Sequence, residues 1–133
     1  MRRLRQRVGR RGAALLFFAL LDLVYCFALL NPPQPLTATY VWMTTLTPLW
    51  VCALCWGAVG MLCLVSAFLE QDTPAFVGAV ALKIGWGLFT LFGWMADAVD
   101  RGYVSAVIWL AFAAFVYLIA GGIPAAPPRR GRT

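Results

Sequence analysis

The chain has 133 residues, of which 62% are hydrophobic and only 12% are charged, with a net charge of +6. Soluble domains carry about 25% charged residues, so this composition excludes a water-soluble fold and indicates an integral membrane protein. There is no histidine, which removes the commonest general base and the commonest metal ligand. The sequence has no phosphate-binding loop, nucleophile elbow or zinc-protease motif either, so we predict a non-enzymatic protein without a cofactor.

Residues 1–12 form a predicted basic tail ahead of the first apolar run. Six arginines crowd this tail: Arg2, Arg3, Arg5, Arg7, Arg10 and Arg11. The Pro/Arg-rich segment 123–133 forms a second tail, with three more: Arg129, Arg130 and Arg132. Basic clusters can bind nucleic acid, but clusters that flank membrane spans favour anionic lipid head groups as partners. The positive-inside rule places both tails in the cytoplasm.

Four apolar runs lie between the tails, at residues 13–30, 48–69, 74–96 and 102–120. Each is about 18–23 residues long, enough to cross a hydrocarbon core about 30 Å thick at about 1.5 Å per residue. Backbone amides in lipid need partners within their own segment, so each run is predicted to be a helix. The predicted fold is therefore an all-α, four-helix transmembrane bundle over residues 13–122.

The segments that connect the apolar runs contain residues typical of helix boundaries. Thr47-Pro48 and Thr73-Pro74 each read as a hydroxyl N-cap followed by proline at the first helical position. Residues 31–46 begin with several prolines, contain no charge and are predicted to form an extended loop on the outer face. Asp72, in the tight turn after the second run, is interpreted as a solvated interface residue.

Two charges lie well inside apolar runs, Asp22 in the first and Lys83 in the third. A charge near the bilayer centre costs about 3 kcal/mol or more. The first and third spans run in the same direction, and both residues lie about 14–15 Å from the inner start of their helices. Matched depth predicts a direct ion pair that lowers the insertion cost of both residues. The alternative is functional, with the two charges on a proton or ion path or on a polar seam facing a pore.

Small residues at helical spacing predict close helix–helix contact, either within the chain or between copies in a homo-oligomer. They are Ala53, Gly57 and Gly60 in the second span and Gly78, Ala81 and Gly85 in the third.

Cys52 and Cys55 form a CxxC pair near the outer end of the second span. Four-helix, quinone-linked thiol oxidoreductases place such a pair near the outer membrane face, and they need a second pair to exchange electrons with soluble partners. The outer loops here contain no cysteine, so a packing role is the preferred interpretation.

Three stretches carry a family resemblance: LDLVY at residues 21–25 after an Arg-rich start, WGLFTLFGW at residues 86–94, and RGYVSAVIWL at residues 101–110. Together they resemble small four-span membrane proteins of actinobacterial phages, some of which are grouped with holins. The resemblance implies a phage- or prophage-encoded, multi-pass protein of the bacterial plasma membrane. It points to no functional residue.

Three function classes follow from these features. The first is a holin-like protein that self-associates through its small-residue faces and permeabilises the plasma membrane. The second is a non-enzymatic accessory or anchor protein, for example in superinfection exclusion, that makes its contacts through the tails and the 31–46 loop. The third is a small transporter or a thiol oxidoreductase that uses Cys52 and Cys55. No nucleic acid or small-molecule ligand is predicted.

Overall fold

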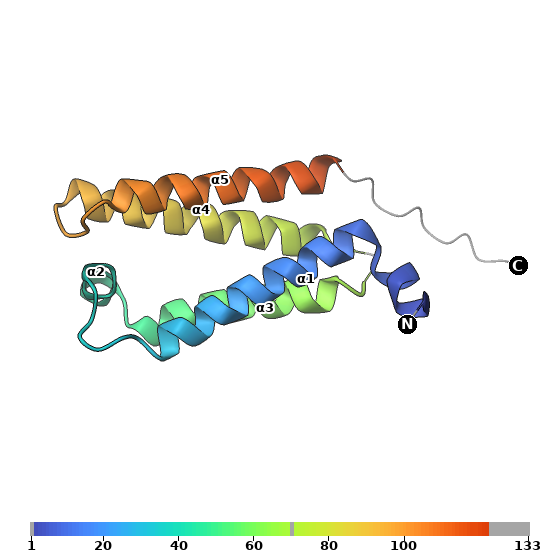
Figure 1. Cartoon of the computed structure of the whole chain (residues 1–133), viewed down its shortest axis with the longest axis horizontal. Helices are drawn as coiled ribbons and strands as arrows, with labels where there is room; N and C mark the ends of the chain where they lie inside the picture. Colours follow the sequence, from blue (N-terminus) through green and yellow to red (C-terminus); the bar gives the residue numbers. More distant parts are fainter. Residues whose placement is uncertain (1, 70, 123–133) are drawn as a thin grey trace, which may run out of the picture.

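The computed structural model describes residues 2–69 and 71–122, with side chains from Arg10 onward in the first helix. These residues contain five α-helices and no strand (Figure 1). The helices are α1 (Arg2–Leu30), α2 (Ala38–Leu46), α3 (Leu49–Ser66), α4 (Thr73–Met95) and α5 (Gly102–Gly122). All but α2 are long and apolar enough to cross a membrane, which confirms the predicted all-α bundle of four membrane-spanning helices.

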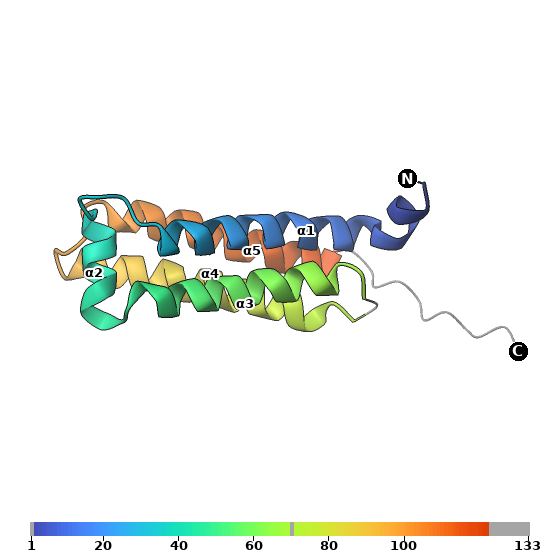
Figure 2. The same ribbon diagram turned by 90° about the horizontal axis from the view of Figure 1, so that it is seen from below.

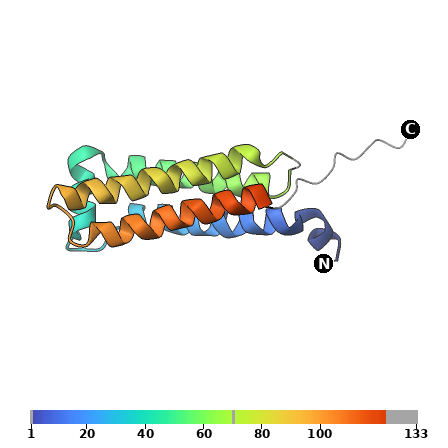
Figure 3. The same ribbon diagram turned by 90° about the horizontal axis from the view of Figure 1, so that it is seen from above.

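The long helices form two antiparallel pairs. α1 packs along α3, α4 packs along α5, and α3 and α4 make the main contact between the pairs. Figure 3 shows α4 and α5 side by side in front of the other pair. The start of α1 and the end of α5 lie at one end of the bundle, here called the tail end, and α2 lies at the other, the α2 end (Figures 1 and 2). With an even number of spans, the start of α1 and the end of α5 must lie at the same end of the bundle.

The first helix starts earlier than the apolar pattern indicates. α1 begins at Arg2, whereas its apolar part, Arg10–Leu30, is close to the predicted span at residues 13–30. Arginine is a good helix former and residues 2–12 contain no proline, so the basic tail continues the helix.

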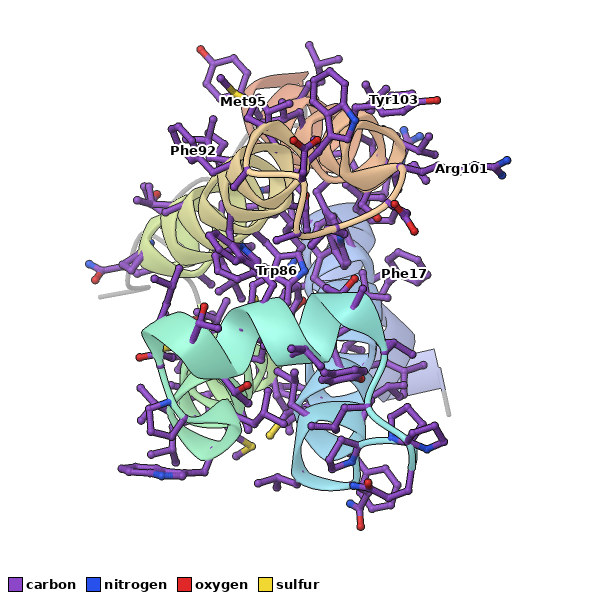
Figure 4. The ribbon with its side chains drawn as sticks, turned by 90° about the vertical axis from the view of Figure 1, so that its left-hand side faces the viewer. Phe17, Trp86, Phe92, Met95, Arg101 and Tyr103 are labelled. Atoms are coloured by element: carbon purple, nitrogen blue, oxygen red, sulfur yellow. The ribbon has the colours of Figure 1, made fainter. Side chains whose placement is uncertain are left out.

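The extended loop predicted at residues 31–46 is wrong over its second half, where the chain forms α2. The prolines are confined to the first half, and the rest carries an apolar pattern that buries Met43 at 2% exposure. α2 lies across the bundle end at a steep angle to the long helices (Figures 2 and 4). It therefore spans from one helix pair to the other and contacts both α3 and α4.

Both predicted threonine N-caps differ in the structure. Thr47 is the C-cap of α2, and the N-cap of α3 is Pro48. Asp72 is the N-cap of α4 without a side-chain capping bond, and Thr73 is the first helical residue. The Asp72 carboxylate is held elsewhere, by an arginine described below.

Each end of the bundle has its own hydrophobic core. Towards the tail end the buried cluster is mainly aliphatic and small, built around Leu15, Phe18, Ala79 and Val116. Towards the α2 end it is built around Trp56, Trp86 and Met43. The two buried charges occur where these cores meet.

Candidate functional site

Asp22 of α1 and Lys83 of α4 meet inside the bundle. The Lys83 ammonium donates a hydrogen bond to Oδ1 of Asp22, and both side chains are 0% exposed. The structure thus brings the predicted intramembrane pair together within one chain. It also shows that this pair joins the α1–α3 half of the bundle to the α4–α5 half.

The environment of the pair explains how two charges are held in an apolar interior. The Lys83 ammonium lies 5.2 Å from the centroid of the Trp56 ring, a cation–π contact that replaces part of its hydration. A Cβ at Gly60 would lie 3.2 Å from Cβ of Asp22, so glycine lets α3 approach α1 closely here. Oδ2 of Asp22 has no hydrogen-bond partner among the described residues. The pair is closed to solvent, with one carboxylate oxygen unused.

An aromatic cluster lies next to the pair, on its α2 side. Tyr25, Trp56, Trp86 and Trp109 come from the four long helices, and neighbouring ring centroids are 4.3–5.5 Å apart. The Trp86 indole donates to the Tyr25 hydroxyl at 3.1 Å, a second polar contact between α1 and α4. Figure 4 shows Trp86 between the two helix pairs. The sequence offers one signal for this cluster, since Tyr25 and Trp86 each follow a buried charge by three residues.

The small residues divide between the inside and the outside of the bundle. Ala53 is buried, and Cβ atoms at Gly57 and Gly60 would contact α1 at Cys26 and Leu23. Gly78 faces Val59 and Leu62 of α3. Ala81 and Gly85 are exposed, and nothing lies within 4 Å of a Cβ placed at Gly85. Four of the six predicted packing positions thus serve contacts within the chain, and two remain on the outer surface.

Arg11, one of the predicted lipid-binding arginines, makes several contacts within the chain. Its Nε donates to Oδ2 of Asp72 at 2.7 Å, and one terminal nitrogen donates to Oδ1 at 2.9 Å. The other terminal nitrogen donates to the Ala120 carbonyl at 2.9 Å, and the guanidinium lies 4.9 Å from the centroid of the Phe76 ring. Arg11 therefore ties α1, the α3–α4 turn and the end of α5 together. The interpretation of Asp72 as a solvated residue is wrong, because its carboxylate is held by this arginine.

The other predicted lipid-binding arginines differ in how far the structure describes them. Arg10 is exposed at the tail end. The side chains of Arg2, Arg3, Arg5 and Arg7, and the whole of Arg129, Arg130 and Arg132, lie outside the described residues.

We expect Arg11→Met to lower the free energy of unfolding by about 1–2 kcal/mol, because a bidentate, partly buried ion pair and a carbonyl contact are lost. Arg10→Met removes the same charge from an exposed neighbour and should change stability by less than about 0.5 kcal/mol. The measurement is SDS-induced unfolding in mixed micelles, followed by tryptophan fluorescence. Equal unfolding midpoints for the two variants would show that the Arg11 contacts contribute nothing.

The cysteines are all free thiols. Cys63 is buried with its sulfur 3.8 Å from the Ala75 carbonyl oxygen, and Cys26 packs opposite Gly57. Cys52 is half-buried and Cys55 is exposed, on the side of α3 near α2. Within the described residues, no group of three or more potential metal-ligating His, Cys, Asp or Glu residues occurs.

Comparison with known proteins adds no relative. No family model, curated protein or solved structure matches the chain. The residues of the chain itself indicate a small multi-pass membrane protein with a buried ion pair at the boundary between two helix pairs.

Proposed function

We propose that this chain is a holin-like protein, encoded by a phage or prophage, that self-associates in the bacterial plasma membrane and then permeabilises it. The observation that carries the proposal is the position of the Asp22–Lys83 pair, fully buried between the two halves of one bundle. Both basic tails lie in the cytoplasm in this proposal and hold anionic lipid head groups.

The closed bundle explains how the protein can accumulate in the membrane without permeabilising it. Helix contacts are extensive within each pair and much sparser between the pairs, which meet mainly through α3 and α4. α1 touches α4 over only a short stretch that includes Asp22–Lys83 and Tyr25–Trp86. With both charges buried, the spans present an apolar surface rich in exposed Phe, Leu and Val to lipid. Such a chain is stable alone in the bilayer.

Separation of the α1–α3 half from the α4–α5 half explains how the protein then permeabilises the membrane. It would expose Asp22 and Lys83, which then require water or the opposite charge of a second copy. The exposed Ala81 and Gly85 offer a small-residue face on which α4 of one copy can approach another closely. Exchange of charge partners between copies yields an oligomer lined by polar groups.

Regulated expression in a bacterium tests this function. We expect membrane potential to stay normal during accumulation and then to collapse abruptly after a delay, as read by a potential-sensitive dye. Asp22→Asn/Lys83→Met should insert and fold but cause no collapse, because the separated halves expose no charge. The matched control, Asp100→Asn/Arg101→Met, removes one acidic and one basic residue from exposed positions outside the tails and should depolarise like the wild type. Normal potential at high expression of the wild-type chain would refute the proposal.

A second candidate is a non-enzymatic accessory or anchor protein. The same burial favours it in one respect, since a bundle that neutralises its own charges needs no oligomer. Its contact surfaces would lie outside the bilayer, at the tails and at α2. In that case, cross-linking in intact cells should recover one stoichiometric partner, and high expression should leave growth unchanged.

A further inference from the structure

A pocket of about 390 Å³ opens on the side of the bundle between α3 and α4, next to α2. α2 contributes Met43 and Leu46 to its wall, and Thr47, the residue after α2, also lines it. Cys55 on α3 and Gly85 on α4 line the pocket and are both exposed, so the opening faces the lipid. Drug-sized ligands occupy pockets of about 300–1,000 Å³, and this one has the size for a single substituted ring.

The lining combines flat aromatic walls with two thiols. Trp56, Trp86 and Phe89 all line the pocket, and the rings of Trp86 and Phe89 stack with centroids 5.5 Å apart. Cys52 and Cys55 line it from α3, one helical turn apart. Packing accounts for Cys26 and Cys63, which contact other helices, but not for Cys55, which is exposed. Flat aromatic walls favour a planar ligand, and an opening to lipid favours a lipophilic one. Two neighbouring thiols can donate two electrons, so the ligand that fits all three features is a two-electron acceptor.

We propose that this pocket binds a membrane-dissolved quinone and that Cys52 and Cys55 form the dithiol that reduces it. The ring lies against Trp86 and Phe89, and its isoprenoid tail leaves between α3 and α4 into the lipid. Thr47 also lines the pocket, and its hydroxyl is a group that can donate a hydrogen bond to a ring carbonyl. The site does not use the Asp22–Lys83 pair, so quinone binding and permeabilisation can fail separately. Ala81 and Gly85, which line the pocket, also belong to the small-residue face proposed for self-association.

The chemical step is a two-electron exchange. Both S–H bonds break and one S–S bond forms, while two electrons and two protons pass to the two carbonyl oxygens, giving the hydroquinone. Residues three apart in a helix have Cβ atoms about 5–6 Å apart, and a disulfide needs about 3.8 Å, so the first turns of α3 must tighten. Oxidation therefore changes the helix next to α2. Because the outer loops contain no second cysteine pair, an external dithiol must reduce this disulfide directly, and strain makes it more readily reduced.

The test uses the full chain in lipid nanodiscs, without air, in a Cys26→Ala/Cys63→Ala background that keeps only the two pocket thiols. Ubiquinone-1 is the probe. We expect it to quench tryptophan fluorescence on binding, and we expect both thiols to be lost to maleimide labelling as one quinone per chain is reduced. Reduction is followed in the ultraviolet absorbance of the quinone.

Two glycine variants provide the matched controls. A Cβ at Gly85 meets nothing within 4 Å and Gly85 lines the pocket, so Gly85→Leu fills the pocket without a clash. Gly121 is equally open and lies at the far end of α5. Gly85→Leu should weaken quenching about tenfold or more, whereas Gly121→Leu should match the background chain. Equal quenching in both variants, absence of quenching because only acyl chains enter, or binding without thiol loss would each overturn the proposal.

Discussion

Asp22→Asn or Lys83→Met alone is expected to destabilise the bundle by about 3–5 kcal/mol, because each leaves the partner's charge uncompensated in the protein interior. Both side chains are 0% exposed, so neither remaining charge can reach water without opening the bundle. A loss of this size is a large part of the free energy of unfolding of a typical domain, about 5–15 kcal/mol. The measurement is the SDS fraction at which the purified chain unfolds in mixed micelles.

The double variant, Asp22→Asn/Lys83→Met, is expected to recover most of that loss. It buries no charge, and methionine fills much of the volume of the lysine stem. The two single losses together come to about 6–10 kcal/mol and the double variant keeps only a small loss, so a double-mutant cycle should give a coupling energy of about 4 kcal/mol or more between the two positions. If the two losses simply add in the double variant, the residues stabilise the bundle independently and the pair is not the contact that joins the halves.

The ion pair could be predicted because lipid leaves few alternatives. The sequence places only Asp22 and Lys83 well inside the apolar runs, and a charge at that depth needs an opposite charge. Depth follows from helix rise alone, so two matched positions on parallel spans identify each other without knowledge of the packing. The four spans were predictable for the same reason, since lipid enforces regular helices.

The features at the membrane surface could not be predicted in this way. α2 is short, and isolated helices of that length are not stable in water, so Ala38–Leu46 gains its helical form from burying Met43 against the bundle. The Arg11–Asp72 contact joins residues 61 positions apart in sequence. Six arginines compete for that role in the sequence, and only the fold brings Arg11 beside the α3–α4 turn.

The small-residue patterns show a second limit of prediction from the sequence, because they do not identify the neighbouring helix. Ala53-x-x-x-Gly57 and Ala81-x-x-x-Gly85 have the same form in sequence, yet the first packs against α1 and the second lies exposed beside the pocket. A spacing pattern identifies a face that permits close approach, but the neighbour that uses it depends on how the helices pair. The pocket has no sequence signature beyond the two cysteines, because its walls come from α2, α3 and α4.

Gly102→Ala is expected to destabilise the α4–α5 hairpin by about 2–3 kcal/mol, because its new methyl group meets a backbone that cannot move away. A Cβ at Gly102 would lie 2.5 Å from the Thr90 carbonyl oxygen and 2.9 Å from Cβ of Trp94. The turn has little freedom to absorb the clash, since Asp97 and Arg101 already have positive φ angles of 53° and 55°. Glycine at the first residue of α5 thus allows the two helices to start in close contact.

The matched control is Gly121→Ala, where a Cβ meets nothing within 4 Å. This change adds the same methyl group to the same helix and should leave stability unchanged or raise it by less than about 1 kcal/mol, since alanine is the better helix former. The ring contact between Trp94 and Tyr103, with centroids 5.3 Å apart, makes the Trp94 fluorine resonance of a fluorotryptophan-labelled chain, assigned with Trp94→Phe, a local reporter of the hairpin. A Gly102→Ala chain that keeps the wild-type unfolding midpoint and Trp94 signal would mean that α5 can shift along α4. The close start of α5 would then not be what fixes the α4–α5 pair.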